Sequence, residues 1–143
     1  MENIVETARQ AGSFNTLVRA IEAADLVETL SKEGPFTVCA PTDKAFSKLP
    51  SGLLNSLLQD KQSLEQVLLY HVASGKAMSR DIVNMKSVKT LQGEELRIDS
   101  SRGVQLEDAR VTQADIECSN GVIHVIDSVL IPSSVQERIL AIQ

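Results

Sequence analysis

Aromatic residues and basic clusters are scarce in this sequence. It has no tryptophan, one tyrosine and three phenylalanines, so the core is expected to be aliphatic. Acidic residues outnumber basic residues by 19 to 14, which gives a net charge of −5. Nucleic acids are bound largely through basic and aromatic side chains. We therefore expect no nucleic-acid partner and no attraction to an anionic membrane surface.

Long apolar runs are also missing. No run approaches the ~20 residues that a helix needs to cross a bilayer, so no transmembrane segment is predicted. Residues 1–6 lack the basic start and the apolar stretch of a secretory signal peptide. Taken alone, the residues fit either a cytoplasmic protein or a mature form whose signal has been removed.

Two cysteines, Cys39 and Cys118, are too few for a disulfide framework. The favoured interpretation is two buried thiols that pack as small apolar groups, and a single disulfide is the alternative. With His71 and His124 they make four candidate zinc ligands, but no two of them have a short spacing. We predict no metal site and no cofactor, and the scattered glycines form no phosphate-binding loop.

Helical periodicity dominates the first half of the chain. The predicted helices cover residues 4–12, 14–24, 25–30, 42–46, 50–58, 63–72 and 79–83. Ser13, Thr42 and Ser63 are the predicted N-caps of three of them. In the helix that starts at Ser63, the apolar stripe is expected to run through His71 to Val72.

Short strands dominate the second half of the chain. The predicted strands are residues 36–40, 88–91, 95–98, 104–106, 109–116, 122–126 and 129–131, and a terminal helix is indicated by Val135, Ile139 and Ile142. Asn120-Gly121 is a typical hairpin turn. Helices followed by strands, without regular alternation, predict an α+β fold. Strand 36–40 stands alone among helices, so we expect it to pair with residues 120–126.

Three segments together resemble the fasciclin (FAS1) domain: GPFTVCAPTDKAF at 34–46, LLYHV at 68–72 and NGVIHVIDSVLIP at 120–132. The resemblance runs from Asn3 to about Pro132. It implies a wedge of short β-strands packed against a layer of N-terminal and central helices, in a single domain over residues 1–143. The first and last segments should lie side by side at its centre. The resemblance also implies a secreted or surface-held, extracytoplasmic protein.

Four residues are candidate binding residues by this resemblance. A tyrosine–histidine pair flanked by branched aliphatics has been linked to adhesion in the family, and Tyr70 and His71 match it. An Asp-Ile pair just before the hairpin belongs to an integrin-recognition motif in family members, and Asp115 and Ile116 match it. The competing interpretation is structural: His71 and Ile116 fill the core, Tyr70 packs its ring, and Asp115 caps a turn.

Three residues near the end of the last fasciclin segment have the types of a hydrolase constellation. His124, Asp127 and Ser128 have suitable residue types, but alternation along a strand puts His124 and Asp127 on opposite faces. The sequence has no Gly-x-Ser-x-Gly elbow. No catalytic residue is predicted, and Asp127 is expected to accept hydrogen bonds that tie the two outer fasciclin segments together.

These observations lead to three functional hypotheses. The leading one is a non-enzymatic adhesion or protein-interaction module whose partner is another protein at a cell surface or matrix, or a surface polysaccharide. The second is a small-molecule-binding or enzymatic domain that uses a cleft between helices and sheet. The third is a structural domain that assembles with copies of itself. A deep cleft with converging polar groups would favour the second hypothesis.

Overall fold

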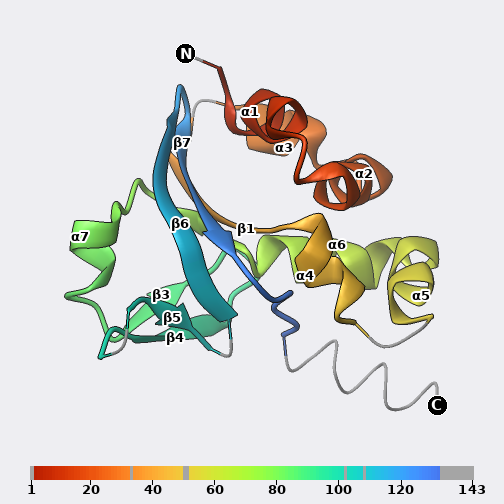
Figure 1. Ribbon diagram of the computed structural model, residues 1–143. Helices are drawn as coiled ribbons and strands as arrows, with labels where there is room; N and C mark the ends of the chain where they lie inside the picture. The colour runs from red at the N-terminus through yellow and green to blue at the C-terminus, as the bar shows by residue number, and fades with distance from the viewer. Residues whose placement is uncertain (1, 33, 50–51, 102, 108, 133–143) are drawn as a thin grey trace.

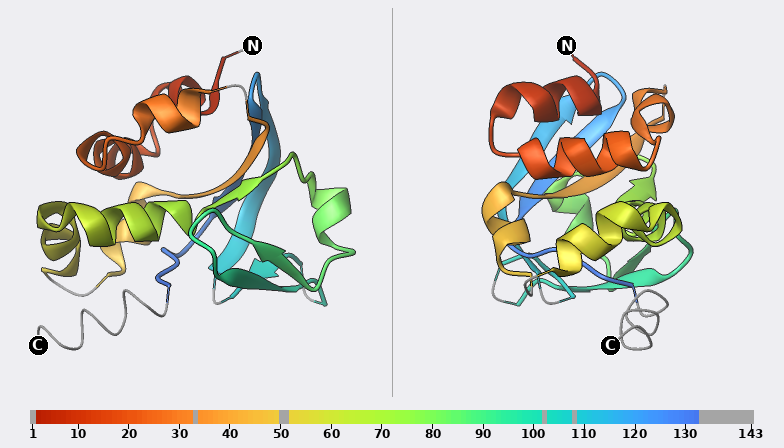
Figure 2. Two further views of the ribbon diagram at one scale, coloured as in Figure 1. Left: turned by 180° about the vertical axis from the view of Figure 1, so that it is seen from behind. Right: turned by 90° about the vertical axis from the view of Figure 1, so that its right-hand side faces the viewer.

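A computed structural model describes residues 2–32, 34–49, 52–101, 103–107 and 109–132 of the chain (Figures 1 and 2). Its helices are α1 (Ile4–Ala11), α2 (Asn15–Ala23), α3 (Val27–Ser31), α4 (Asp43–Ser47), α5 (Leu53–Gln59), α6 (Lys61–Leu69) and α7 (Ser79–Ile82). Its strands are β1 (Phe36–Pro41), β2 (Val72–Ser74), β3 (Ser87–Lys89), β4 (Glu95–Asp99), β5 (Gln105–Leu106), β6 (Ala109–Cys118) and β7 (Gly121–Ile126). The fold is α+β, as the sequence predicts.

The strands follow the order β2-β1-β7-β6-β5-β4-β3. β1 and β7 pair in parallel over their whole length, from Phe36 beside Gly121 to Pro41 beside Ile126. The other neighbours are antiparallel. The predicted pairing of strand 36–40 with residues 120–126 is therefore confirmed. Because both central strands are covered on both faces, their sequences are almost continuously apolar.

Side chains on opposite faces of β1 and β7 enter two different apolar clusters. Val38, Ala40, Ile123 and Val125 face the helices α1–α3 and α6 and form the larger cluster with them. Cys39 and Ile126 belong to a smaller cluster with residues of β4, β5 and β6. Figure 1 shows the helices on one side of the β6–β7 hairpin, and α7 with the small strands β3–β5 on the other.

Asn120 connects the first and last fasciclin segments to the helices. Its backbone carbonyl accepts a hydrogen bond from the Phe36 amide at 2.9 Å. Its side-chain oxygen accepts from the Ile4 amide at 2.9 Å, and its amide group donates to the carbonyls of Leu30 and Lys32, both at 2.7 Å. One buried residue thus joins α1 and α3 through its side chain and β1 through its backbone carbonyl. Sequence reasoning identified only the hairpin turn at this position.

Two of the three predicted N-caps differ in the structure. Thr42 caps α4 as predicted, through a hydrogen bond from the Ala45 amide. The prediction of Ser13 for α2 is wrong, because the Asp43 carboxylate accepts from the Thr16 amide at 2.7 Å instead. The prediction of Ser63 for α6 is also wrong, because Asp60 is the N-cap and accepts from the Ser63 amide and hydroxyl.

Two segments near the predicted site differ from the sequence prediction. The helix expected over 63–72 ends at Leu69, and Val72–Ser74 forms strand β2 beside β1. Residues 129–131, predicted as a strand, are irregular. The predicted helix start at Pro50 and the terminal helix lie outside the described residues. No helix in the described ranges combines the length and the apolar character that crossing a membrane requires.

Candidate functional site

Tyr70 and His71 directly follow α6, and their side chains pack in different environments. Tyr70 is the C-cap residue of α6, and its ring packs in the smaller apolar cluster. His71 is 3% exposed. Its Nδ1 lies 2.7 Å from the Val67 carbonyl, and its Nε2 accepts from the Leu130 amide at 2.9 Å. A carbonyl can only accept and an amide can only donate, so the proton is on Nδ1 and the ring is neutral.

The environment of His71 opposes protonation. Burial lowers its pKa to about 4, although the hydrogen bond to the Val67 carbonyl acts in the opposite direction. A general base near pH 7 needs a pKa close to that pH and a free nitrogen within reach of a substrate. In His71 both ring nitrogens are already bonded to backbone groups. The ring acts as a brace between α6 and the segment that follows β7.

Asp115 lies on β6 at an irregularity of the β6–β7 register, with φ of 62°. Its carboxylate accepts from the Ser79 amide at 2.7 Å and from the Ser79 hydroxyl at 2.5 Å. These hydrogen bonds lower the pKa of Asp115. The carboxylate therefore fastens the start of α7 to β6. The side chain stays exposed to solvent, whereas Ile116 is half-buried against the helical cluster.

His124 completes this network beneath Asp115. The ring is fully buried; its Nδ1 accepts from the Asp115 amide at 3.2 Å, and its Nε2 donates to the Ala77 carbonyl at 2.7 Å. It is therefore neutral with the proton on Nε2, the opposite tautomer from His71. Asp127 accepts instead from the Arg110 amide at 2.8 Å. That bond joins β7 to β6, so the predicted tie between the outer fasciclin segments is not made by this carboxylate.

Both cysteines are buried, free thiols. Cys39 is in the smaller apolar cluster and Cys118 is in the helical one. Burial raises the pKa of the Cys39 thiol to about 12 and raises that of Cys118 as well. A thiol with a raised pKa carries little thiolate, which is the reactive form. The predicted packing role is confirmed for both residues.

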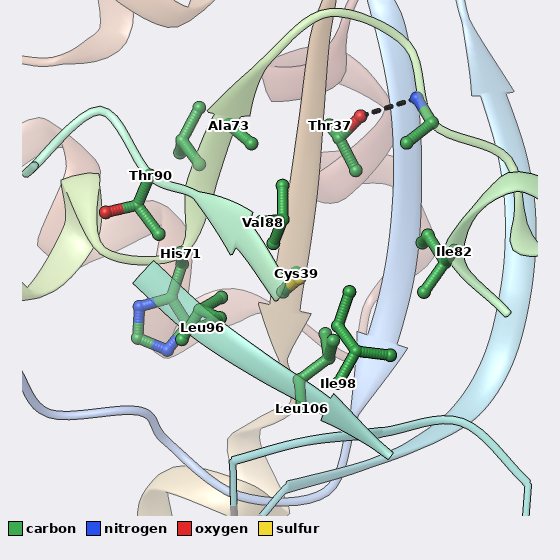
Figure 3. A pocket seen from close by; sticks show the side chains of 12 residues that line it. Thr37, Cys39, His71, Ala73, Ile82, Val88, Thr90, Leu96, Ile98 and Leu106 are labelled. Atoms are coloured by element: carbon green, nitrogen blue, oxygen red, sulfur yellow. Dashed lines mark hydrogen bonds between the residues drawn. The ribbon is translucent and has the colours of Figure 1, made fainter. Parts of the chain in front are cut away.

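An apolar cavity separates β1 and β2 from the small strands (Figure 3). Its lining includes Thr37, Cys39, His71, Ile82, Leu96 and Leu106. The volume is about 20 Å³, which is room for about one water molecule. The hydroxyls of Thr37 and Thr90 in this lining are already hydrogen-bonded to the backbone, Thr37 to the Ala77 amide and the Gly75 carbonyl and Thr90 to the Glu94 carbonyl. This cavity lies on the sheet face away from the helices α1–α6. A larger open cleft of about 580 Å³ is lined by residues of β3, β4 and β6 and by residues 128–131, so neither lies between helices and sheet, where the second hypothesis placed its cleft.

Comparison with known proteins identifies the family to which the chain belongs. The family model of the fasciclin domain matches residues 12–132. The chain belongs to the fasciclin-domain family. It is 45% identical to the uncharacterized protein sll1735 of Synechocystis sp. over 92% of this chain and 98% of that protein. It is 39% identical to the transforming growth factor-beta-induced protein ig-h3 of Sus scrofa, over 96% of this chain but only 21% of that protein.

The fold has a solved counterpart. A FAS1 domain pair from the insect cell adhesion molecule fasciclin I superposes with a TM-score of 0.75 over 94% of this chain and 52% of that one. The two sequences are 18% identical, so this likeness concerns the fold alone. Within that fold, the structure brings Asp115, His124 and Ser79 together. His71 lies on the other side of β1, where its carbonyl accepts from the amide of Cys39, the residue that pairs with His124.

Proposed function

We propose that this protein is a non-enzymatic adhesion or protein-interaction module that works in an extracytoplasmic setting. Membership in the fasciclin-domain family supports the proposal. The main observation behind it concerns the two histidines. All four of their ring nitrogens are hydrogen-bonded to backbone groups. Acid–base catalysis needs a titratable group with a free position toward its substrate. The surface is the part of this domain left for recognition.

The proposed contact surface is the solvent-facing side of β6 together with α7. Along β6, Thr112, Gln113, Asp115 and Glu117 are exposed, and the Lys76–Glu117 ion pair lies beside them at 2.8 Å. Figure 1 shows α7 on the opposite side of the β6–β7 hairpin from the helices α1–α6. The partner is another protein at a cell surface or in a matrix. Asp115 offers it a carboxylate that is rigidly positioned by Ser79, which suits a receptor that holds a metal ion.

The test separates the charge of Asp115 from its structural role. Asparagine tolerates a positive φ. Its side-chain oxygen can accept from the Ser79 amide and its NH2 group can donate to the Ser79 hydroxyl oxygen, so Asp115→Asn removes the charge and keeps the backbone. Attachment of cultured fibroblasts to a surface coated with the protein should fall by about tenfold or more in magnesium-containing medium. The urea midpoint should stay unchanged.

Asp99→Asn is the matched control. Asp99 also accepts from the amide and the hydroxyl of a serine, Ser101, and it also has a lowered pKa, but it lies on β4. Attachment of this variant should equal that of the unaltered protein. Equal attachment of the Asp115→Asn variant would remove the β6 face as the contact site.

A further inference from the structure

An Asn-Gly pair, Asn120-Gly121, lies where the turn after β6 enters β7. It is the single such pair among the five asparagines of the chain. Because glycine has no Cβ atom, its backbone can bring its amide nitrogen against the side-chain carbonyl of the preceding asparagine. That approach starts deamidation, which converts the side-chain amide to a carboxylate. In the unfolded chain, Asn120 is therefore the asparagine most prone to this reaction.

The folded protein holds the Asn120 side chain away from Gly121. Asn120 is 4% exposed, and its side-chain oxygen accepts from the Ile4 amide at 2.9 Å. Both hydrogens of its amide group are used as well, because they are donated to the carbonyls of Leu30 and Lys32 at 2.7 Å. All three bonds run to the start of α1 and the end of α3. Rotation toward the Gly121 nitrogen would break them, so deamidation requires these helices to move away.

The backbone around the pair is held in place too. The Phe36 amide donates to the Asn120 carbonyl at 2.9 Å, and a Cβ atom added at Gly121 would overlap the Phe36 carbonyl. The Ser119 amide donates to the Glu2 carbonyl at 2.8 Å, so the segment before α1 is also tied to this turn. The glycine nitrogen therefore cannot approach the asparagine side chain while β1 and α1 keep their positions.

We propose that Asn120 is a deamidation site which the docking of α1 and α3 protects, and whose conversion keeps these helices from docking again. In the reaction, the Gly121 nitrogen forms a bond to Asn120 Cγ. The Cγ–Nδ2 bond breaks, and the proton of the Gly121 amide leaves with that nitrogen as ammonia. Water then opens the cyclic imide at either carbonyl carbon, which gives aspartate or isoaspartate. The step needs water and no oxidant or reductant.

The product does not fit the place of the asparagine. A carboxylate at position 120 has no hydrogen to donate, so the carbonyls of Leu30 and Lys32 lose their donor and face a negative charge instead. Isoaspartate also lengthens the backbone between β6 and β7 by one atom. Since the ammonia is lost, the change runs in one direction. The domain would thus record the time that its N-terminal helices spend undocked, independently of any adhesion through Asp115.

The first test compares the folded and the unfolded chain. The full chain is kept at pH 8 with and without urea, and mass spectrometry of its peptides follows conversion at each asparagine. In urea, Asn120 should convert faster than the other four asparagines. Without urea, its conversion should be slower by about a hundredfold or more, because the reaction then waits for an opening of the structure.

Two N-cap variants show which opening matters. Asn3 caps α1 through a hydrogen bond from the Glu6 amide, and Thr42 caps α4 in the same way from the Ala45 amide. Asn3→Ala loosens the turn that bonds Asn120, so it should speed conversion of Asn120 in the folded protein by about fivefold. Thr42→Ala removes a comparable cap from another helix and should change the rate by less than about twofold.

Asn120→Asp tests the effect of the product. Hydrogen exchange of the α1 amides should be faster in this variant than in the unaltered protein by about tenfold or more. Asn84→Asp is the matched control, because Asn84 also donates to a carbonyl, that of Arg80 at 3.1 Å, but is exposed. It should leave exchange in α1 unchanged.

Three results would overturn the proposal. In the first, Asn120 converts at the same rate in the folded and the unfolded chain. In the second, Asn3→Ala and Thr42→Ala speed its conversion equally, which would mean that global unfolding exposes it. In the third, Asn120→Asp leaves hydrogen exchange in α1 unchanged, which would mean that the product still docks.

Discussion

At the scale of single residues, the two histidines serve as structural links. His71 joins Val67 to Leu130, and His124 joins Asp115 to Ala77. Each ring bonds two backbone groups that lie on different segments of the chain. Removing a ring therefore leaves a donor and an acceptor unpaired in the interior, which costs more than losing one exposed contact.

The first prediction concerns His71→Ala. The substitution leaves the Leu130 amide without its acceptor and opens space beside the cavity, so it should lower the free energy of unfolding by about 1–3 kcal/mol. Urea denaturation measures this. Lys32→Ala, an exposed control, should stay within about 0.5 kcal/mol of the unaltered protein. An unchanged midpoint together with lost partner binding would favour direct contact by His71.

The second prediction concerns pH. The pKa of His71 is lowered to about 4 in the folded protein from 6.5, so the unfolded chain binds more protons between these values. The stability from the neutral ring is therefore complete above pH 6.5 and is lost as the pH falls toward 4, by up to about 3 kcal/mol.

A His71→Gln variant isolates this contribution. Glutamine does not titrate, so the difference in unfolding free energy between the variant and the unaltered protein should shrink from pH 7 to pH 4. Both proteins keep His124 and all carboxylates, whose titration cancels in the difference. A difference that is constant over this range would contradict the lowered pKa.

At the scale of helices and strands, sequence patterns predict the elements better than their ends. Alternating and continuous apolar runs placed β1, β4, β6 and β7 correctly, because burial on one or both faces leaves a direct imprint on the sequence. The hairpin at Asn120-Gly121 was also predictable from turn chemistry. The pairing of β1 with β7 was predictable because a strand isolated among helices needs a distant strand to bond its backbone N–H and C=O groups.

Long-range contacts account for two of the errors. Asp43 caps α2 from 27 positions away, so the local pattern pointed to Ser13 instead. Val72–Ser74 continues the apolar stripe of α6 in sequence, yet it extends along β1 because that edge needs a partner. A helical period alone cannot distinguish these two outcomes for a short apolar run.

The third prediction tests how closely β1 approaches β7. A Cβ atom added at Gly121 would overlap the backbone carbonyl of Phe36. Backbone atoms cannot move aside as a side-chain end can, so Gly121→Ala should lower the free energy of unfolding by about 3 kcal/mol or more. Thermal or urea unfolding measures the loss.

Gly75→Ala is the control for this prediction. Gly75 has φ of 93°, and no atom lies near the position of an added Cβ. Its substitution should cost only the conformational strain of about 1 kcal/mol. If the two variants lose the same stability, the close approach of β1 to Gly121 is not the cause.

At the scale of the whole molecule, the cysteines and histidines are inside, and the recognition that we propose is left to the surface. The two thiols and both imidazoles are buried, while the carboxylates of Asp115 and Glu117 on β6 are exposed. The burial of His71 was predictable from its place in an apolar run. Its bond to Leu130, 59 positions away, and the Asp115–His124 contact were not, because they arise from the topology of the sheet.

The most direct test of this account is the tautomer of each histidine. A long-range proton–nitrogen NMR spectrum at pH 7 distinguishes Nδ1-H from Nε2-H rings. We predict a single, neutral Nδ1-H form for His71 and a single, neutral Nε2-H form for His124. Mixed tautomers, or charged rings at this pH, would mean that the ring nitrogens do not keep their hydrogen bonds to the backbone. The non-enzymatic account would then lose its main structural support.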